Sequence, residues 1–253
     1  MDLNSTEATP EAPLEVSLQL SPPRLRKSDR PDGETTLQER ASRKHGPAIG
    51  DEHARGSSLG AIERQAKECR RCELYKHASQ LVFGEGACDA KVVLVGEQPG
   101  DKEDLAGRPF VGPAGAVLRD CLHAAGMERD SCYLTNAVKH FKYEQRGKRR
   151  LHSRPNAGEI QRCAWWLGAE LEQLQPNVVV ALGASAARSL LGPSVKVTRD
   201  RGRLITIAAP FRILVTIHPS YLLRIRDRKI ANRERMRFID DLRLASKLQE
   251  ESG

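Results

Sequence analysis

The sequence predicts an α/β protein, a three-layer α/β/α sandwich around a central, mainly parallel four-stranded sheet. Two observations lead to this fold class. Short apolar runs rich in valine, leucine and isoleucine are typical of strands that are covered on both faces. These runs alternate along the chain with longer amphipathic segments, as in sheets whose strands are joined by helices. Such sheets bind ligands at the edge where the parallel strands end, so the residues that follow each strand are the first candidates for a site.

Four segments carry the strand pattern. They are Lys91–Gly96 (KVVLVG), Cys132–Val138 (CYLTNAV), Asn177–Leu182 (NVVVAL) and Arg212–Ile217 (RILVTI). Residues typical of helix ends flank the segments expected to be helical: Ser58 can cap the first, Gly126 follows the second and Pro176 stops the third. The expected helices are Leu59–Cys69, Pro113–Gly126, Asn156–Leu174, Ala184–Leu191 and Ala231–Glu250.

Charge and composition divide the chain into two parts. Residues 1–58 hold ten acids and eight Lys or Arg and few large apolar side chains, so we expect a disordered tail ahead of a folded domain at 59–253. Because the whole chain has a net charge of +8, the folded part carries +10, which suggests a polyanionic partner such as nucleic acid. No apolar run approaches the roughly 20 residues of a membrane span, and the polar N-terminus lacks a secretory pattern. We expect a cytoplasmic protein without membrane contact.

A glycine-rich segment, GEQPGDKEDLAGRPFVGPAG at 96–115, follows the first strand. Its five Gly and three Pro specify a shaped loop, and the absence of a following Gly-Lys-Ser/Thr excludes a phosphate-binding P-loop. The loop contains the carboxylate of Glu97 and the flat ring of Phe110. Polar residues also follow the other strands, among them Asn136 and His218. A surface loop with a core phenylalanine and a capping histidine is the simpler interpretation of these residues taken alone.

Three motifs together resemble the family 4 uracil-DNA glycosylases over roughly residues 60–245. The glycine-rich segment is similar to the first motif of that family, CYLTNAVK to its uracil-reading strand, and IHPSYLLR at 217–224 to its second catalytic motif. The resemblance implies excision of uracil from DNA, including single-stranded DNA, by a monomer. A base inside a duplex must first be flipped into a pocket, where stacking and hydrogen bonds recognise it.

The resemblance also implies a role for each matching residue. Phe110 would stack under uracil, Asn136 would read its edge, and His218 would donate to uracil O2 as charge develops there. Glu97 would act near the sugar C1′ as a general base or as electrostatic support. The remaining expected contacts are to base and sugar through the backbone of Gly96, Gln98 and Gly100, and to DNA phosphate through Ser220 and Arg224.

Cysteine spacing points to a metal site. Cys69 and Cys72 form a C-x-x-C pair, and six cysteines without a secretory signal are better explained by metal binding than by disulfides. By the family resemblance Cys163 is a further ligand of a [4Fe–4S] cluster. The family has cysteine where this chain has His140, so we expect His140 as the remaining ligand, with Cys132 as its competitor. Spacing alone would equally permit zinc.

The segment Lys139–Arg154 departs from the family, which has a short connection there. It holds seven Lys or Arg against one acid, so a phosphate-binding loop is one interpretation, with Lys148, Arg149 and Arg150 as contacts. Its KRRLH run is similar to the loop of UdgX-type proteins, whose histidine bonds covalently to sugar C1′ after uracil leaves, and Gln98 also fits that group. His152 is the matching residue. We therefore expect covalent attachment to abasic DNA, with two alternatives: a conventional turnover glycosylase, or a non-enzymatic nucleic-acid-binding metal module.

Overall fold

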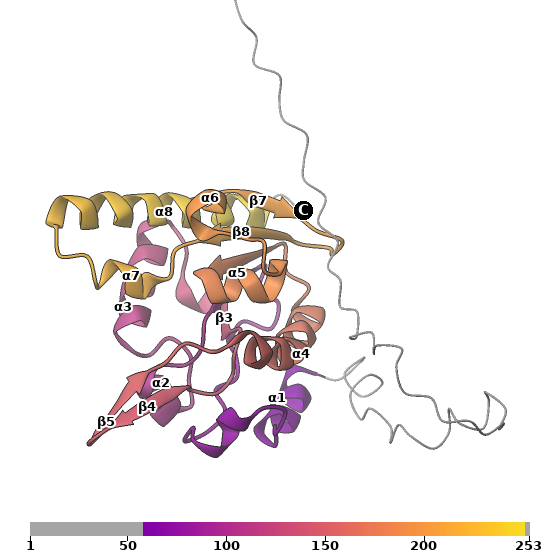
Figure 1. Cartoon of the computed structure of the whole chain (residues 1–253). Helices are drawn as coiled ribbons and strands as arrows, with labels where there is room; N and C mark the ends of the chain where they lie inside the picture. Colours follow the sequence, from indigo (N-terminus) through magenta and orange to yellow (C-terminus); the bar gives the residue numbers. More distant parts are fainter. Residues whose placement is uncertain (1–57, 251–253) are drawn as a thin grey trace, which may run out of the picture.

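Four parallel strands form the centre of the sheet in the computed structural model, which describes residues 58–250 (Figure 1). They are β2 (Val92–Gly96), β3 (Tyr133–Asn136), β6 (Val178–Leu182) and β8 (Arg212–Thr216), in the order β3-β2-β6-β8. The expected α/β fold with a mainly parallel sheet is confirmed. All residues of β2 and β6 are buried, as their unbroken apolar sequences indicate. The register places Gly96 beside Asn136, so two motif residues lie together at the same strand ends.

The expectation of four strands is wrong, because the sheet has six. The two additional strands, β1 (Glu85–Gly86) and β7 (Leu204–Thr206), pair antiparallel to β3 and β8 at the two edges. They have two and three residues, too few for a hydrophobic period to be visible in the sequence.

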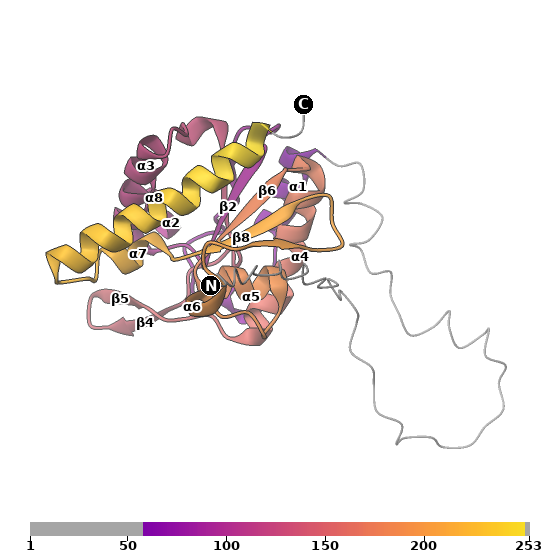
Figure 2. The same cartoon turned by 90° about the horizontal axis from the view of Figure 1, so that it is seen from above.

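Helices cover both faces of the sheet, as Figure 2 shows from above. On one face the core joins the sheet to α3 (Pro113–Ala124) and α8 (Arg228–Glu250). On the other it joins the sheet to α4 (Ala157–Leu174) and α5 (Ala184–Leu191), and α1 (Leu59–Lys67) packs on α4. Asn156 starts α4 with a reciprocal cap, because its Oδ1 accepts from the Glu159 N–H at 2.9 Å and Glu159 accepts from the Asn156 N–H at 2.6 Å.

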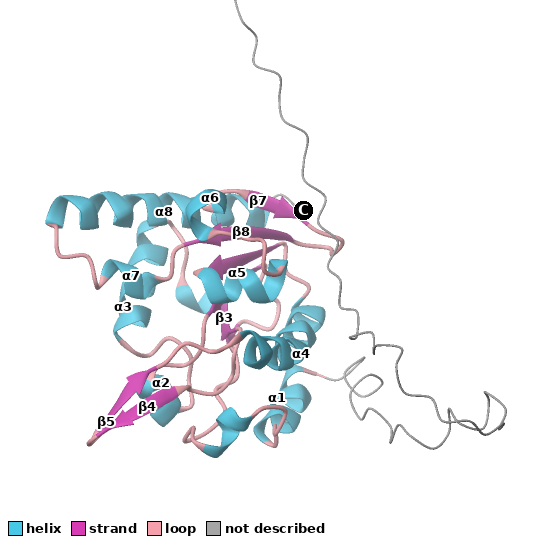
Figure 3. Ribbon diagram, in the orientation of Figure 1, coloured by secondary structure: helices cyan, strands magenta, loops and turns pink. Residues whose placement is uncertain are grey.

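Several short elements were not predicted. They are α2 (Asp101–Ala106) inside the glycine-rich segment, α6 (Val197–Asp200), α7 (Pro219–Leu222) and the 3₁₀ turns Glu73–Lys76 and Arg129–Ser131. The segment treated as a loop contains a hairpin of β4 (Tyr143–Arg146) and β5 (Arg149–His152), which projects from the domain in Figure 3. Gly147 turns the hairpin with a φ of +57°, in the left-handed region that favours glycine.

The expected tail at residues 1–58 lies outside the described residues, except for Ser58. Ser58 occupies the N-cap position of α1, as expected, although its side chain makes no capping hydrogen bond. Among the described residues, no helix is both long and apolar enough to cross a membrane.

Candidate active site

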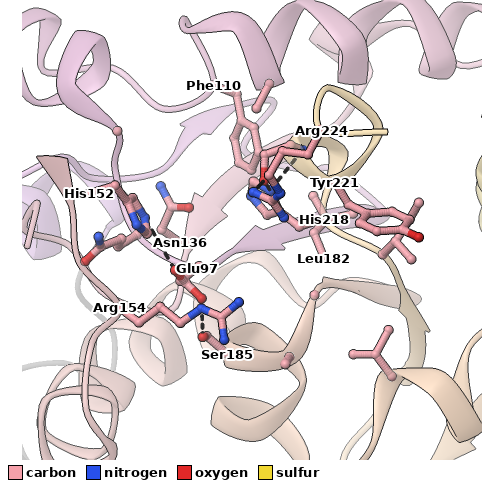
Figure 4. Close-up of a pocket in the computed structure, with 18 of the residues that line it drawn as sticks. Glu97, Phe110, Asn136, His152, Arg154, Leu182, Ser185, His218, Tyr221 and Arg224 are labelled. Atoms are coloured by element: carbon pink, nitrogen blue, oxygen red, sulfur yellow. Dashed lines mark hydrogen bonds and ion pairs between the residues drawn. The ribbon is translucent and has the colours of Figure 1, made fainter. Parts of the chain in front are cut away.

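A cleft of about 1010 Å³ opens at the carboxyl ends of the parallel strands, the edge that the sequence pattern indicates. Figure 4 shows side chains from the glycine-rich loop, β3, β5 and α7 pointing toward one another in this cleft. Nine of the residues expected to bind substrate or DNA, or to act in catalysis, line it: Glu97, Gln98, Gly100, Phe110, Asn136, His152, His218, Ser220 and Arg224.

Asn136 and Phe110 are buried side chains that line the cleft, and Gly96 lies against both of them. Asn136 is 3% exposed and Phe110 is 5% exposed. A Cβ atom at Gly96 would meet Asn136 Oδ1 at 2.3 Å and Phe110 Cζ at 2.7 Å. Glycine at this position therefore allows the Asn136 amide and the Phe110 ring to lie directly against the backbone, which makes Gly96 a shaping residue of the pocket.

Phe110 holds an uncommon backbone conformation at the pocket, with a φ of +55°. Positive φ is unusual for a bulky residue, and such conformations persist where surrounding contacts fix them. Glu103, which is buried, accepts backbone hydrogen bonds from Gly100, Phe110 and Gly112 and so ties the loop together. Burial nonetheless raises the pKa of the Glu103 carboxyl. Gly115 lies so close to the Phe110 carbonyl that a Cβ atom there would be 1.8 Å from its oxygen.

His218 follows β8 and faces Phe110, with ring centroids 6.2 Å apart and an angle of 27° between the planes. Its Nδ1 accepts a hydrogen bond from the Ser220 N–H at 3.2 Å and lies 2.8 Å from Ser220 Oγ. Burial lowers the pKa of His218 to about 4, with further lowering by Arg224 and His152. The ring is therefore neutral near pH 7, and because Nδ1 accepts, the proton is on Nε2, which can donate to a ligand.

Glu97 is the carboxylate of the cleft. One of its oxygens, Oε2, accepts a hydrogen bond from Ser185 Oγ, at the start of α5. The other, Oε1, lies 3.4 Å from His152 Nε2 on β5. Since these partners come from opposite sides of the cleft, they orient both carboxylate oxygens. His152 keeps a side-chain exposure of 46% and remains accessible from solvent.

The base of the hairpin is held by Gln98. Its Nε2 donates to the carbonyl oxygens of Lys142 (3.1 Å) and Ser153 (3.0 Å), and its Oε1 accepts from the Lys142 N–H at 3.1 Å. The Gln98 side chain thus bridges the two chain segments that enter and leave the hairpin. This contact places His152, which immediately precedes Ser153, at the mouth of the cleft.

Most cations of the Lys139–Arg154 segment are paired within the protein. Lys139 is fully buried against Glu170, and Lys142 Nζ lies 3.0 Å from Glu159. Arg150 bonds Asp101 and Asp104, each at 2.6 Å, and its guanidinium lies over the rings of Phe141 and Tyr143. The sequence could not show these pairings, because the carboxylates come from other elements. In the described part of the chain, Lys148, Arg149 and Arg154 are exposed and form no salt bridge.

The four expected metal ligands come from three parts of the chain, the segment after α1, the segment after β3 and α4, and lie in one region. Cys69, Cys72 and Cys163 belong to one buried cluster, and His140 lines a small cavity together with Cys69. Cys69 Sγ accepts from the Trp166 indole at 3.1 Å, and Cys163 Sγ accepts from the Lys139 N–H at 3.2 Å. Burial raises the pKa of Cys163 to about 12 and lowers that of His140 to about 4. Within residues 58–250, no three His, Cys, Asp or Glu side chains are arranged to hold a metal ion.

Cys132, the competing ligand, lies elsewhere. It packs with Cys121 and Leu134 in the core under α3 and α8, whereas Cys163 is on α4 at the other side of the sheet. Its Sγ donates to the Glu128 carbonyl at 3.6 Å.

Among the cleft residues that the sequence interpretation missed are Arg154, Ser185, Tyr221 and Arg237. Ser185 could have been predicted from the sequence, because it lies two residues after Gly183 at the end of β6, and sites in such sheets lie at the strand ends. Arg154 follows the hairpin, and its position depends on a fold that the segment's composition does not reveal.

Comparisons with known proteins show the family to which the chain belongs. The model of the uracil DNA glycosylase superfamily matches residues 83–243, and the chain belongs to this superfamily. A type-4 uracil-DNA glycosylase of Thermotoga maritima is 34% identical over 202 residues, which cover 79% of this chain and 100% of the relative. A type-4 enzyme of Archaeoglobus fulgidus is 33% identical (66% of this chain, 83% of the relative), and a type-5 enzyme of Pyrobaculum aerophilum is 30% identical (67% and 78%).

Proposed function

We propose that the protein removes uracil from DNA by hydrolysing the N-glycosidic bond and then turns over, as the names of its type-4 relatives favour. The observation that carries the proposal is the convergence of Phe110, Asn136, His218 and Glu97 in one cleft at the strand ends. A flipped base fits such a site, because an aromatic face stacks on it and a buried amide hydrogen-bonds its edge. Release of free uracil from uracil-containing DNA tests the proposal.

The proposed reaction depends on two oriented groups of the cleft, the His218 imidazole and the Glu97 carboxylate. As the bond between C1′ and the base breaks, its electron pair moves to uracil, and the Nε2–H of neutral His218 donates to the developing oxyanion. Glu97, opposite, stabilises the positive charge on the sugar and accepts the proton of the water that attacks C1′. Ser185 and His152 hold the Glu97 carboxylate through its two oxygens.

We further propose that single-stranded DNA is a substrate and that the chain works as a monomer. All the groups needed for recognition and cleavage line a cleft that is formed within one chain. An open single strand also presents its base without the cost of breaking a pair.

A second candidate function is covalent capture of the abasic sugar by His152. The observation that favours it is the 3.4 Å contact between His152 Nε2 and Glu97 Oε1, which places the imidazole beside the carboxylate expected near C1′. In this step the bond between C1′ and uracil has broken with its electron pair on uracil, the unprotonated Nε2 of His152 bonds to C1′ in place of water, and the Nδ1 proton of the resulting imidazolium passes to solvent.

His152→Ser separates the two functions. Under covalent capture, the parental protein gives a protein–DNA band on a denaturing gel, and His152→Ser loses the band but still releases uracil, because water reaches C1′ instead. Under turnover, neither protein gives a band and both release many equivalents of uracil. His123, an exposed histidine on α3, supplies the matched control, since His123→Ser should behave as the parent under either function.

We propose a [4Fe–4S] cluster with Cys69, Cys72, Cys163 and His140 as its ligands. Three buried thiols, two from the segment just after α1 and one from α4, lie in one cluster, and two of them already accept N–H hydrogen bonds of the kind that support bound thiolates. The location of Cys132 on the opposite side of the sheet favours His140 as the fourth ligand. The cluster would cross-link the N-terminal helix to β3 and α4, a structural contribution.

Cys163→Ala is expected to lose iron and thermal stability together, because metal binding couples to folding. The purified parental protein should be brown, with iron and sulfide near a ratio of one. Cys132→Ala, a buried cysteine outside the set, is the control and should keep its iron. A colourless protein loaded with zinc would contradict the iron–sulfur assignment, and iron loss in Cys132→Ala but not in His140→Ala would transfer the fourth ligand to Cys132.

A further inference from the structure

The segment from α7 into the first half of α8 carries a concentrated positive charge that catalysis does not use. Residues 221–238 hold seven Arg or Lys and two acids. Both acids are occupied: Glu234 is buried and pairs with Arg201, and Asp227 Oδ1 accepts from the N–H groups of Lys229 and Ile230 at the start of α8. The outward face of this segment is therefore strongly cationic.

The cations of this surface point to solvent. Arg226, Arg228 and Lys229 are exposed and form no salt bridge with other described residues. Arg233 has a side-chain exposure of 68% and reaches Glu234 only at 3.8 Å. We call these four residues the α8 basic surface. Unpaired cations held close together repel one another, which an anionic partner would relieve.

The α8 basic surface is continuous with the cleft. Arg237, which lines the cleft, lies one turn after Arg233 on the same face of α8, and Arg224 lines the cleft from the end of α7. Figures 1 and 2 show the start of α8 and the β4–β5 hairpin projecting on the same side of the molecule. The exposed cations Lys148 and Arg149 sit at the turn of that hairpin. Two basic projections thus flank the cleft that contains Glu97.

Apolar side chains lie among the cations of this segment. Tyr221 and Leu223 have exposures of 40% and 52%, and Tyr221 also lines the cleft. Cations that follow a backbone, interleaved with exposed aromatic or apolar groups that contact bases, are the pattern of surfaces that hold single-stranded nucleic acid.

We infer that the α8 basic surface binds the phosphates of the DNA strand on one side of the flipped uridine, while Lys148 and Arg149 hold the strand on the other side. This inference deepens the proposed function and rests on it. The uracil-bearing strand then crosses the cleft from one projection to the other, and its backbone is held at both ends while the base turns inward. Phosphate contacts of this kind position the strand without reading its sequence.

The first test measures binding to uracil-free single-stranded DNA as a function of salt, so it does not depend on excision. Arg228→Gln with Lys229→Gln removes two cations from the first turn of α8, where positive charge opposes the helix dipole, so the fold should be retained. Each lost phosphate contact on a single strand lowers the slope of log K against log salt by about 0.7, so the slope should fall by about 1.4. The affinity ratio of parent to variant then shrinks about sevenfold between about 50 and about 200 mM salt.

A matched control removes the same charge elsewhere. Arg64→Gln with Lys247→Gln changes two exposed cations on α1 and at the far end of α8, neither of which lines the cleft. The control should keep the parental slope. An equal loss of slope in the control and in the α8 variant would show that only net charge matters and would overturn the inference.

The second test uses DNA in which uracil has about ten flanking nucleotides on one side only, either 5′ or 3′. The α8 variant should bind one of these substrates more weakly and show a higher KM for it. The hairpin variant, Lys148→Ala with Arg149→Ala, should show the same two changes with the other substrate. Loss on the same substrate in both variants, or equal loss on both substrates, would contradict a strand that crosses the cleft. A parental protein that shows the salt slopes but releases no uracil would reject the proposed function and leave the binding surface intact.

Discussion

His218→Ala is expected to slow uracil release about 10²–10³-fold in single-turnover measurements, the range for removing one donor to a developing oxyanion. The Ser220 N–H and Oγ both contact His218 Nδ1. The Nε2–H group of His218 is therefore the one that can donate to the ligand. Phe110 faces the same ring across the pocket and should still stack on uracil, so substrate binding should change much less than the rate. Ser220→Ala, which removes only one contact to Nδ1, provides a graded control with a smaller loss.

The lowered pKa of His218 also predicts how the rate of uracil release depends on pH. Burial disfavours the imidazolium and lowers the pKa to about 4, so the ring stays neutral from pH 8 down to about pH 5. Protonation of His218 should therefore cause no loss of activity near pH 6.5, the ordinary pKa of histidine, and should affect the rate only near pH 4. A parental excision rate in His218→Ala would remove this residue from the chemistry.

Asn136→Asp is expected to reduce excision about 10²–10³-fold, because it replaces an amide that donates and accepts with a carboxylate that only accepts. The side chain is 3% exposed, so water cannot replace the lost donor, and a negative charge would oppose the departing uracil anion. Asn156→Asp makes the same change at the N-cap of α4, where aspartate caps equally well, and should keep the parental rate. Parental excision by Asn136→Asp would show that the pocket has been assigned to the wrong residues.

The sequence predicted the parts of the site that lie at strand ends. Gly96, Asn136 and His218 follow buried apolar runs, and parallel strands bring such residues to one edge whatever their separation along the chain. The conformation of Phe110 was not predictable, because its positive φ depends on Glu103 and on the close approach of Gly115.

The hairpin shows where composition misleads. The cation count of the Lys139–Arg154 segment suggested a phosphate-binding loop with Lys148, Arg149 and Arg150 as contacts. Arg150 instead pairs with Asp101 and Asp104 within the protein, and Lys139 pairs with Glu170. Sequence alone could not show which cations meet carboxylates from other elements. The structure leaves Lys148 and Arg149 exposed at the hairpin turn and Arg154 exposed after the hairpin. The edge strands β1 and β7 were missed for a different reason, since pairing rather than hydrophobic pattern defines strands so short.

The assignment of uracil excision is tested most directly by quantifying free base released from two single-stranded oligonucleotides that differ only in one uracil or thymine at the same position. The parental protein should release uracil stoichiometrically or better and no detectable thymine, as expected for a pocket that recognises the flipped base by stacking and by its hydrogen-bonding edge. The variant Glu97→Gln, which retains the shape of the cleft, should release uracil far more slowly. Release of both bases at similar rates, or of neither base by the folded parental protein, would contradict the account.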